Sequence, residues 1–420
     1  MSHTPRTRTV LSCSLLVVAL CVGGTACGET DDHPLSAKPY DAARQIVFSG
    51  PSGNQKADPD KPLEVTSKGG EGRITDVTAT DAVGRYVAGE LSADGTRWHT
   101  TVPLAAAAHY TLRVSAEDKE GAPGNKVITF DTGTPKEKNT LEVGFGPDEG
   151  TYGVGQPVIA ELSEPVKDKA SRRIVERGLK VESKPVVEGS WYWVDDQTLH
   201  YRPKEYWPAD AKVTARSNLK GIKIADRLWG DETKPLNLTI GDRIVAVTDA
   251  AAHVMTVYRN GEEINEIPVT TGKPGYETRN GVKVILGKEY FVRMRGTSIG
   301  IASGSSDSYD LPVYWATRVT WSGEYVHAAP WSVGSQGAAN VSHGCTGMST
   351  GNAAWFFETV KEGDLVQVIN SNGEDMDAFG NGYGDWNLDW GDWEEGSSIL
   401  GKPSERRPPA AQIARLRPQV

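Results

Sequence analysis

Apolar and polar residues alternate with a period of two along the first third of the chain. Tyr110, Leu112, Val114 and Ala116 are separated by polar residues, and residues 127–130 form a second strand-like run. This alternation is typical of half-buried β-strands. Turn dipeptides such as Asp94-Gly95 separate the runs. Short strands with this spacing predict a small β-sandwich over residues 45–133, without a disulfide.

The same period continues from residue 137 to residue 241, after a linker around residues 134–136. Trp191 and Trp193 share one face of a predicted strand, with Tyr192 opposite. Apolar residues alternate along a last strand at Leu236, Leu238 and Ile240. The two units are similar in size and share no obvious motif. We therefore expect two consecutive sandwiches.

A third unit, residues 242–370, mixes strands with one helix. Asn260-Gly261 is the strongest short hairpin signal, and it separates strand-like residues 253–258 and 264–269. Further strands are predicted at residues 282–286, 290–294, 316–320 and 365–369. Ser349 can cap a helix that Gly363 ends. The apolar residues at helical spacing in between are Ala353, Phe356, Phe357 and Val360.

Two segments follow the third unit. Residues 371–401 contain Trp386, Trp390 and Trp393 among many Asp and Gly. We predict that this extension packs back onto the body; a carbohydrate-stacking platform is the alternative. Residues 402–420 are rich in Pro and Arg, and we predict that they are disordered.

The N-terminus reads as a secretory signal over residues 1–26. Arg6 and Arg8 precede an apolar run, residues 11–22, which is too short for an ordinary membrane span. Small residues then lead to Cys27, where a bacterial lipoprotein signal places its lipidated cysteine. We predict lipidation of Cys27, with residues 27–44 as a tether; simple secretion is the alternative.

The length of the chain limits the number of domains, and its net charge argues against nucleic-acid binding. The chain has 420 residues, enough for two to four domains. Its formal net charge is −10, whereas nucleic-acid binders usually carry a basic patch. We expect no nucleic-acid partner.

The cysteines are informative because there are only four, Cys13, Cys21, Cys27 and Cys345. The first two would leave with the signal. If Cys27 is lipidated, Cys345 is the one free thiol of the mature chain. Such a thiol is either buried and inert or reactive.

Residues 327–348 surround that thiol with groups that carry chemistry. They include His327 and His343, two of the eight histidines in the chain. A thiol nucleophile needs a base that removes its proton and backbone donors for an oxyanion. Gly344 would let the backbone approach a substrate closely. The segment therefore indicates nucleophilic catalysis at Cys345.

Two other interpretations of this segment remain open. Cys345 could be a small buried hydrophobe. Alternatively, Cys345 and the two histidines could bind zinc, although structural zinc sites take four ligands and only three candidates occur here. We predict no metal and no cofactor.

At this point the sequence resembles a known family. His327 followed by Ser342-His343-Gly344-Cys345 is similar to the signature of the L,D-transpeptidases, and residues 309–369 resemble the catalytic core of the mycobacterial members. Matching segments lie at residues 315–317, 322–323, 330–334, 336–337, 355–356, 363–364 and 384–387. The resemblance implies a mainly β chain, with two immunoglobulin-like sandwiches before a β-rich catalytic domain.

The resemblance also implies catalytic roles. Cys345 would be the nucleophile and His327 its general base. The backbone carbonyl of Ala328 would orient the imidazole, replacing the acid of a Ser-His-Asp triad. The amides of Gly344 and Cys345 would line the oxyanion hole, assisted by Tyr309, which also shapes the substrate channel.

Four further residues would bind substrate on the same grounds. His343 would support the loop and the substrate pocket, and Ser342 precedes it in the signature. Trp331 and Asn340 match positions near the site.

One departure from the family pattern follows the cysteine. Relatives usually carry an aliphatic residue and then Asn or Arg, whereas here Thr346 is followed by Gly347 and Met348. Gly347 therefore raises a question about local substrate contacts and about the rigidity of the loop.

The expected activity is formation of 3→3 cross-links between peptidoglycan stem peptides, a tetrapeptide donor and an amine acceptor, through a thioester. The alternatives are an L,D-carboxypeptidase that hydrolyses the same thioester, and a non-catalytic wall-binding lipoprotein. Carbapenems are the expected covalent inhibitors. The expected location is outside the cytoplasm, anchored to the membrane by lipid and facing the wall.

Overall fold

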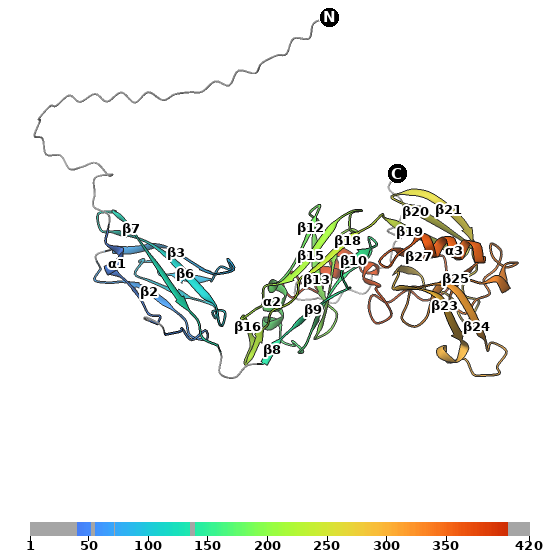
Figure 1. Ribbon diagram of the computed structural model, residues 1–420, viewed down its shortest axis with the longest axis horizontal. Coiled ribbons are helices and arrows are strands. Elements are labelled where there is room, and N and C mark those ends of the chain that lie inside the picture. Colours follow the sequence, from blue (N-terminus) through green and yellow to red (C-terminus); the bar gives the residue numbers. More distant parts are fainter. Residues whose placement is uncertain (1–39, 52–54, 71, 135–138, 402–420) are drawn as a thin grey trace, which may run out of the picture.

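The computed structural model describes residues 40–51, 55–70, 72–134 and 139–401. The expected signal, Cys27, most of the tether and the 402–420 tail lie outside these residues. Three β-rich units follow one another along the long axis (Figure 1). The prediction of a mainly β chain is confirmed. No helix among the described residues has the length and apolar character needed to cross a membrane.

The first unit is a sandwich of two antiparallel sheets, ordered β1-β2-β5-β4 and β3-β6-β7. The predicted alternation is confirmed along β6, where Tyr110, Leu112, Val114 and Ala116 are all buried. The elements are α1 (Ala42–Gln45), β1 (Ile46–Phe48), β2 (Glu64–Ser67), β3 (Gly72–Asp81), β4 (Gly89–Leu91), β5 (Arg97–Thr100), β6 (His109–Asp118) and β7 (Pro123–Asp131).

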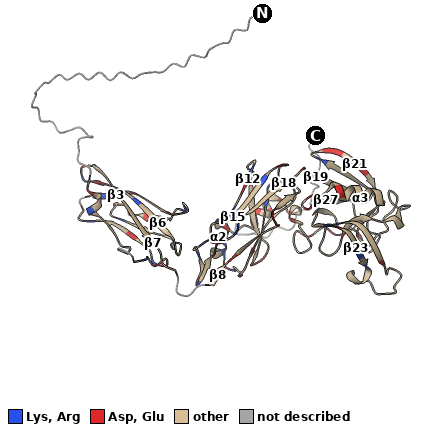
Figure 2. Cartoon of the chain, viewed as in Figure 1, with Lys and Arg blue, Asp and Glu red and all other residues tan. Residues whose placement is uncertain are grey.

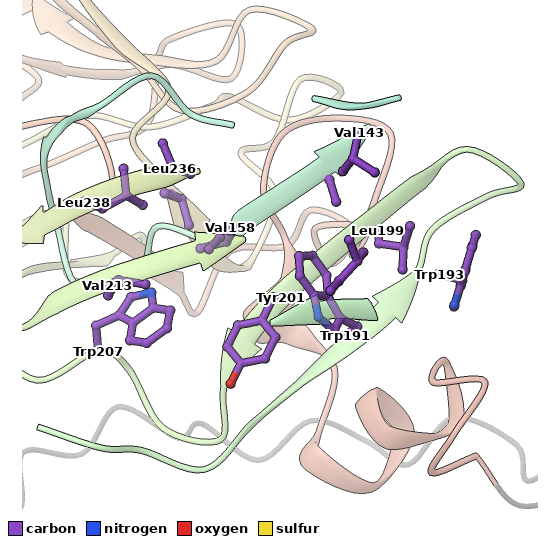
Figure 3. Packing of buried hydrophobic residues seen from close by; sticks show 14 of the residues in the cluster. Val143, Val158, Trp191, Trp193, Leu199, Tyr201, Trp207, Val213, Leu236 and Leu238 are labelled. Atoms are coloured by element: carbon purple, nitrogen blue, oxygen red, sulfur yellow. The ribbon is translucent and has the colours of Figure 1, made fainter. Parts of the chain in front are cut away.

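The second unit is also a sandwich, with sheets β10-β18-β15-β12 and β13-β14-β11-β9 and a small sheet β16-β17-β8. Its strands are β8 (Asn139–Leu141), β9 (Val143–Gly146), β10 (Gly150–Tyr152), β11 (Val158–Leu162), β12 (Leu179–Lys184), β13 (Gly189–Trp193), β14 (Thr198–Pro203), β15 (Lys212–Ser217), β16 (Lys223–Ala225), β17 (Leu228–Gly230) and β18 (Leu236–Ile240). Trp191, Tyr201 and Trp207 lie among aliphatic side chains from both sheets (Figure 3).

A helix that the sequence analysis missed contacts β12 and β16 of this unit. α2 (Lys169–Gly178) begins after Asp168, whose side chain accepts a hydrogen bond from the Ser171 amide at 2.9 Å. The sequence analysis predicted strands and no helix for residues 137–241. The helix is largely polar, and Val175 is the one apolar residue among its fully buried side chains, so few apolar positions mark it in the sequence.

The third unit packs two sheets around a helix. One sheet has the order β21-β20-β19-β27-β22 and the other β23-β24-β25-β26. The strands are β19 (Ile244–Asp249), β20 (Val254–Arg259), β21 (Glu262–Pro268), β22 (Gly281–Val284), β23 (Gly287–Arg295), β24 (Asp310–Arg318), β25 (Tyr325–Ala328), β26 (Thr346–Met348) and β27 (Leu365–Ile369), with short helices η1 (Gly296–Ile299) and η2 (Pro330–Ser332). The hairpin prediction is confirmed, with Asn260 and Gly261 joining β20 to β21.

Helix α3 (Thr350–Thr359) begins at the predicted N-cap, because the Ser349 side chain accepts a hydrogen bond from the Asn352 amide. The predicted end at Gly363 was wrong, since the helix ends at Thr359. Lys288 on β23 donates to the carbonyl oxygens of Phe357, at 2.5 Å, and Val360, at 2.7 Å. A distant side chain thus covers carbonyls that the last turn leaves unpaired.

The C-terminal extension, with η3 (Asp385–Asn387) and α4 (Trp390–Glu395), lies against the second sandwich. The indoles of Trp386 and Trp393 are buried and donate to the carbonyl oxygens of Gly155 and Ser190. The Arg202 guanidinium lies over both rings, within 4.8 Å of their centroids. Two buried indoles cannot serve as an exposed carbohydrate platform.

The second and third units share one hydrophobic core, to which Val245, Val282, Val284 and Leu365 contribute from the third unit. Acidic and basic side chains are interspersed over all three units (Figure 2). The unit that contains His327 and Cys345 therefore packs against the neighbouring sandwich through this shared core.

Candidate active site

Parallel pairing of β25 with β26 brings the signature residues together. His327 pairs with Gly347 in register, and Cys345 stands immediately before β26. Side chains at alternate positions of a strand point to the same face. The Cys345 side chain, two residues before Gly347, therefore lies on the face that also carries His327. Both residues line one cavity of about 850 Å³.

His327 is held as a neutral base. It is 5% exposed, and its Nδ1 atom lies 2.8 Å from the carbonyl oxygen of Ala328. A carbonyl oxygen only accepts hydrogen bonds, so Nδ1 carries the proton and Nε2 keeps its lone pair. Burial lowers the pKa of His327, and the hydrogen bond to Ala328 opposes this shift. The imidazole is consequently neutral and able to accept a proton at neutral pH.

Cys345 rests as a protonated thiol. Its sulfur donates to the carbonyl oxygen of Gly323 at 3.6 Å and packs beside Tyr325 and Val313. Burial raises the pKa of the Cys345 thiol to about 12, and the backbone of Tyr325 opposes that rise. The resting pair is therefore a neutral thiol and a neutral imidazole, and the proton has to move when a substrate arrives.

The loop before the cysteine is fixed by hydroxyl groups. Gly344 has a φ of +112°, which favours glycine, and its carbonyl oxygen accepts from Thr278 Oγ1 at 2.7 Å. Ser342 Oγ donates to the carbonyl oxygen of Cys345 at 2.6 Å and accepts from the Gly344 amide at 3.2 Å. In this state, the Gly344 amide is thus occupied by a side chain.

His343 lies in an aromatic sandwich at the cavity wall. Its ring centroid is 4.7 Å from that of Tyr276 and 5.0 Å from that of Tyr309. Its Nε2 atom is 3.8 Å from Asp307, whose carboxylate is paired with Lys273. Burial lowers the pKa of His343, and Lys273 adds to this effect. The ring therefore acts as a neutral wall rather than as a charged group.

The structure brings together most of the predicted site residues. The cavity is lined by Cys345, His327, Tyr309, Trp331, Ser342, His343 and Gly344. Ala328 does not line the cavity, and its carbonyl oxygen accepts a hydrogen bond from Nδ1 of His327. Trp331 is half exposed at the cavity, with its ring 6.0 Å from that of His327.

Asn340 does not join them. Its Oδ1 atom accepts hydrogen bonds from the Thr271 amide at 2.9 Å and from His253 at 3.0 Å. Its Nδ2 atom donates to the Ala250 carbonyl oxygen at 2.8 Å, and the residue is not among those that line the cavity. The structure therefore places Asn340 behind the cavity lining, where its amide anchors the loop, and a substrate contact at Asn340 stays a prediction.

Sequence reasoning missed a charged group beside the thiol. Glu324 and Arg279 line the cavity, and Lys283 lies buried behind them, bonded to Glu324. A signal was present in the sequence, because Lys283 interrupts an apolar stretch between Val282 and Val284. A lysine at a buried strand position needs a partner charge.

Among the residues that the structure describes, no group of three His, Cys, Asp or Glu side chains could hold a metal ion. The zinc interpretation of Cys345 and the two histidines therefore finds no ligand set in this part of the chain.

Comparison with known proteins separates the N-terminal part of the chain from the third unit. Residues 54–223 match the model of a bacterial Ig domain, and residues 242–368 match that of the L,D-transpeptidase catalytic domain. L,D-transpeptidase 2 of Mycobacterium tuberculosis is 33% identical over 402 residues, which cover 94% of this chain and 96% of the relative.

Two further similarities cover the C-terminal half. L,D-transpeptidase 1 of Mycobacterium tuberculosis is 40% identical over 217 residues, or 52% of this chain and 80% of the relative. A solved L,D-transpeptidase in complex with imipenem is 38% identical, with a TM-score of 0.47, over 56% of this chain and 100% of that one. With a relative matched along nearly its whole length, this chain belongs to the L,D-transpeptidase family.

Proposed function

We propose that the chain forms 3→3 cross-links between peptidoglycan stem peptides, through a thioester on Cys345. Membership of the family supports the transpeptidase activity. The observation that carries the assignment of roles is the shared cavity of a neutral Cys345 thiol and a neutral His327 imidazole, on one face of β25 and β26. Nothing else in the described cavity combines a nucleophile with an oriented base.

The first half-reaction forms the thioester. His327 Nε2 takes the thiol proton, and the sulfur attacks the carbonyl of the diamino-acid residue in a donor tetrapeptide. A tetrahedral oxyanion forms and then collapses. The C–N bond to the terminal D-alanine breaks, and His327 returns the proton to the leaving amine. Cys345 then carries the acyl group.

The second half-reaction forms the cross-link. An amine of a neighbouring stem attacks the thioester and loses a proton to His327, the C–S bond breaks, and the sulfur recovers the proton. Water that reached the thioester first would release a tripeptide instead. The wall built by Trp331, Tyr309 and His343 is suited to shielding this bond, because it is largely aromatic.

The oxyanion would be bound by the amides of Gly344 and Cys345, with Tyr309 nearby. Burial raises the pKa of Tyr309, so its hydroxyl stays protonated and able to donate. The Gly344 amide is held by Ser342 Oγ at 3.2 Å in this state. We expect the oxyanion to displace this long contact, and Ser342 to stay in place through its shorter bond to the Cys345 carbonyl.

Purified protein incubated with a tetrapeptide stem tests the assignment. We expect stem dimers and free D-alanine, and we expect neither product from Cys345→Ala. Tripeptide without dimer would favour the carboxypeptidase. If Cys345→Ala still cross-links stems, the assigned nucleophile is wrong.

Intact-protein mass spectrometry with imipenem supplies an independent test. A relative was solved in complex with this carbapenem, and we expect one covalent adduct, located on the Cys345 peptide. Folded protein that imipenem and neutral thiol reagents both fail to label would favour the non-catalytic wall-binding lipoprotein.

We further propose that residues 1–26 are a cleaved signal and that Cys27 carries a lipid, so that the enzyme faces the wall from the membrane surface. The basic and apolar pattern before Cys27 supports this. Full-length protein in its producing cells should fractionate with membranes and incorporate labelled fatty acid. Cys27→Ala should lose both properties; incorporation that persists in this variant would contradict the proposal.

A further inference from the structure

A buried lysine lies behind the active-site cavity. Lys283 is 1% exposed and sits on β22 between two buried valines. Its ammonium group bonds to Glu324, which is 7% exposed. Burying both charges costs several kcal/mol per ion before their attraction repays it. Valine could fill position 283 without this desolvation cost. Packing alone therefore does not explain why a buried ion pair is found there.

Glu324 joins three parts of the domain. One carboxylate oxygen takes the Lys283 ammonium group, and the other accepts from the Arg279 guanidinium at 2.9 Å. The backbone amide of Glu324 donates to Thr320 Oγ1 at 2.8 Å. The carboxylate thus ties β22 and the segment around Arg279 to the turn that leads into β25.

This turn touches the nucleophile. Gly323, the residue before Glu324, provides the carbonyl oxygen that accepts from the Cys345 thiol. A methyl group placed on Gly344 would come within 4.0 Å of the Glu324 side chain. Glu324, Arg279 and Cys345 all line the same cavity. The ion pair is therefore a neighbour of the sulfur, and not only a brace within the fold.

We propose that Lys283 is a charge-balancing residue for the nucleophile. It neutralises the Glu324 carboxylate, which would otherwise oppose the thiolate form of Cys345. Glu324 in turn holds the Gly323 turn against the sulfur. The inference rests on the proposed role of Cys345 and adds to it a device that tunes the reactivity of the thiol.

The electrostatics agree with this division of roles. After burial and the Tyr325 backbone, Glu324 raises the pKa of Cys345 and Lys283 lowers it. Other titratable or charged groups also face the cavity or the sulfur: Tyr276, Glu277, Arg279, Tyr309, Tyr325, His327, His343 and Glu374. These groups are unchanged in the variants below, so they contribute equally to the pH dependence of thiol alkylation in each variant.

The key comparison is between Lys283→Met and the double variant Lys283→Met/Glu324→Gln. In the single variant, Arg279 still pairs with Glu324, but one positive charge near the sulfur is gone. We expect the apparent thiol pKa to rise by roughly one unit and alkylation by iodoacetamide near neutral pH to slow about threefold, since higher nucleophilicity offsets part of the lost thiolate. Imipenem acylation should slow as well.

Adding Glu324→Gln to Lys283→Met should restore the reactivity of the Cys345 thiol. Glu324→Gln removes the unbalanced charge and keeps the shape of the side chain, so the alkylation profile of the double variant should return close to that of the unmodified protein. A purely structural ion pair predicts the reverse, because the double variant would then be impaired at least as much as the single one. That outcome, or an unchanged profile in Lys283→Met, would overturn the proposal.

Two controls complete the experiment. Lys361→Met removes the cation beside another buried carboxylate, Asp364, at 3.7 Å, and should leave the thiol profile unchanged. Thermal unfolding of each variant establishes that it is folded. Alkylation requires no transpeptidation, so a failure of the proposed cross-linking activity would leave this test readable.

Discussion

Thr270 and Gly347 exchange two backbone hydrogen bonds, of 2.8 and 2.9 Å, in the wall of the active-site cavity. The residue that departs from the family pattern is therefore held firmly in place, as part of β26. The departure does not loosen the loop after Cys345, and the reason for glycine at this position is steric.

A side chain at Gly347 should be poorly tolerated. A Cβ atom there would lie 2.9 Å from Ala329 Cβ and 3.2 Å from Thr270 Cγ2. Overpacking of this kind costs about 1–3 kcal/mol. We expect Gly347→Ala to lower the free energy of unfolding by that amount and to reduce imipenem acylation, as measured by denaturant titration and mass spectrometry.

Gly351 offers a matched control. It lies in α3, and a Cβ atom there would meet nothing within 4 Å. Gly351→Ala should stabilise the protein by about 0.5–1 kcal/mol, because alanine is the better helix former. Equal stability of the two alanine variants would contradict the steric argument.

Thr278 should be needed for a well-ordered nucleophile loop. Its Oγ1 atom accepts from the Gly272 amide at 2.9 Å and donates to the Gly344 carbonyl oxygen at 2.7 Å. Thr278→Val leaves both groups buried without a partner, which costs about 1–3 kcal/mol each. We expect lower stability together with a fall in kcat for stem transfer.

The control for that change is Thr248→Val on β19. Thr248 is fully buried, and within the described part of the chain its hydroxyl has no hydrogen-bond partner. Replacing it with valine should be neutral or stabilising and should leave kcat unchanged. A fall in kcat in both variants would mean that the loss follows from any change of this type.

The dependence of the acylation rate on pH should show that His327 is neutral in the resting enzyme. Burial lowers its pKa below the ordinary value of 6.5, so the imidazole remains a base as the pH falls to that value. The imipenem acylation rate should therefore decline only below about pH 6.5. His327→Asn should abolish this acid limb, whereas His109→Gln, at an exposed site in the first sandwich, should retain it. An acid limb above the ordinary histidine value would rule the argument out.

Asp364 should make the protein less stable as pH rises. Burial raises the pKa of this carboxyl from 3.8 to about 7. Between those values the folded state binds more protons than the unfolded state, so the free energy of unfolding falls with rising pH. The loss is on the order of 1–4 kcal/mol. Chemical denaturation at several pH values should show it.

Asp364→Asn should remove this fall in the free energy of unfolding over the same pH range. The carboxylate of Asp226 is exposed, so Asp226→Asn should leave the profile unchanged. If the two variants show the same pH dependence, Asp364 is not its source.

Much of the local structure was readable from the sequence because it depends on neighbouring residues. The alternation from Tyr110 to Ala116 fixes which side chains of β6 face the core. Asn260-Gly261 specifies a tight hairpin because both residues adopt positive φ angles. Ser349 marks the start of α3 through a hydrogen bond that spans three residues. The pairing of Cys345 with His327 was implied by the resemblance of residues 327–345 to the family signature.

Only the tertiary structure decided what depends on distant partners. Carbonyl oxygens at the end of α3 accept hydrogen bonds from Lys288 on β23. The amide of Asn340 bonds to groups about 70 to 90 residues away in the chain. The charge pair of Lys283 and Glu324 forms because β22 packs beneath the turn into β25. Sequence periodicity shows which face of an element is buried, but not which buried group it meets, because that choice is made by packing.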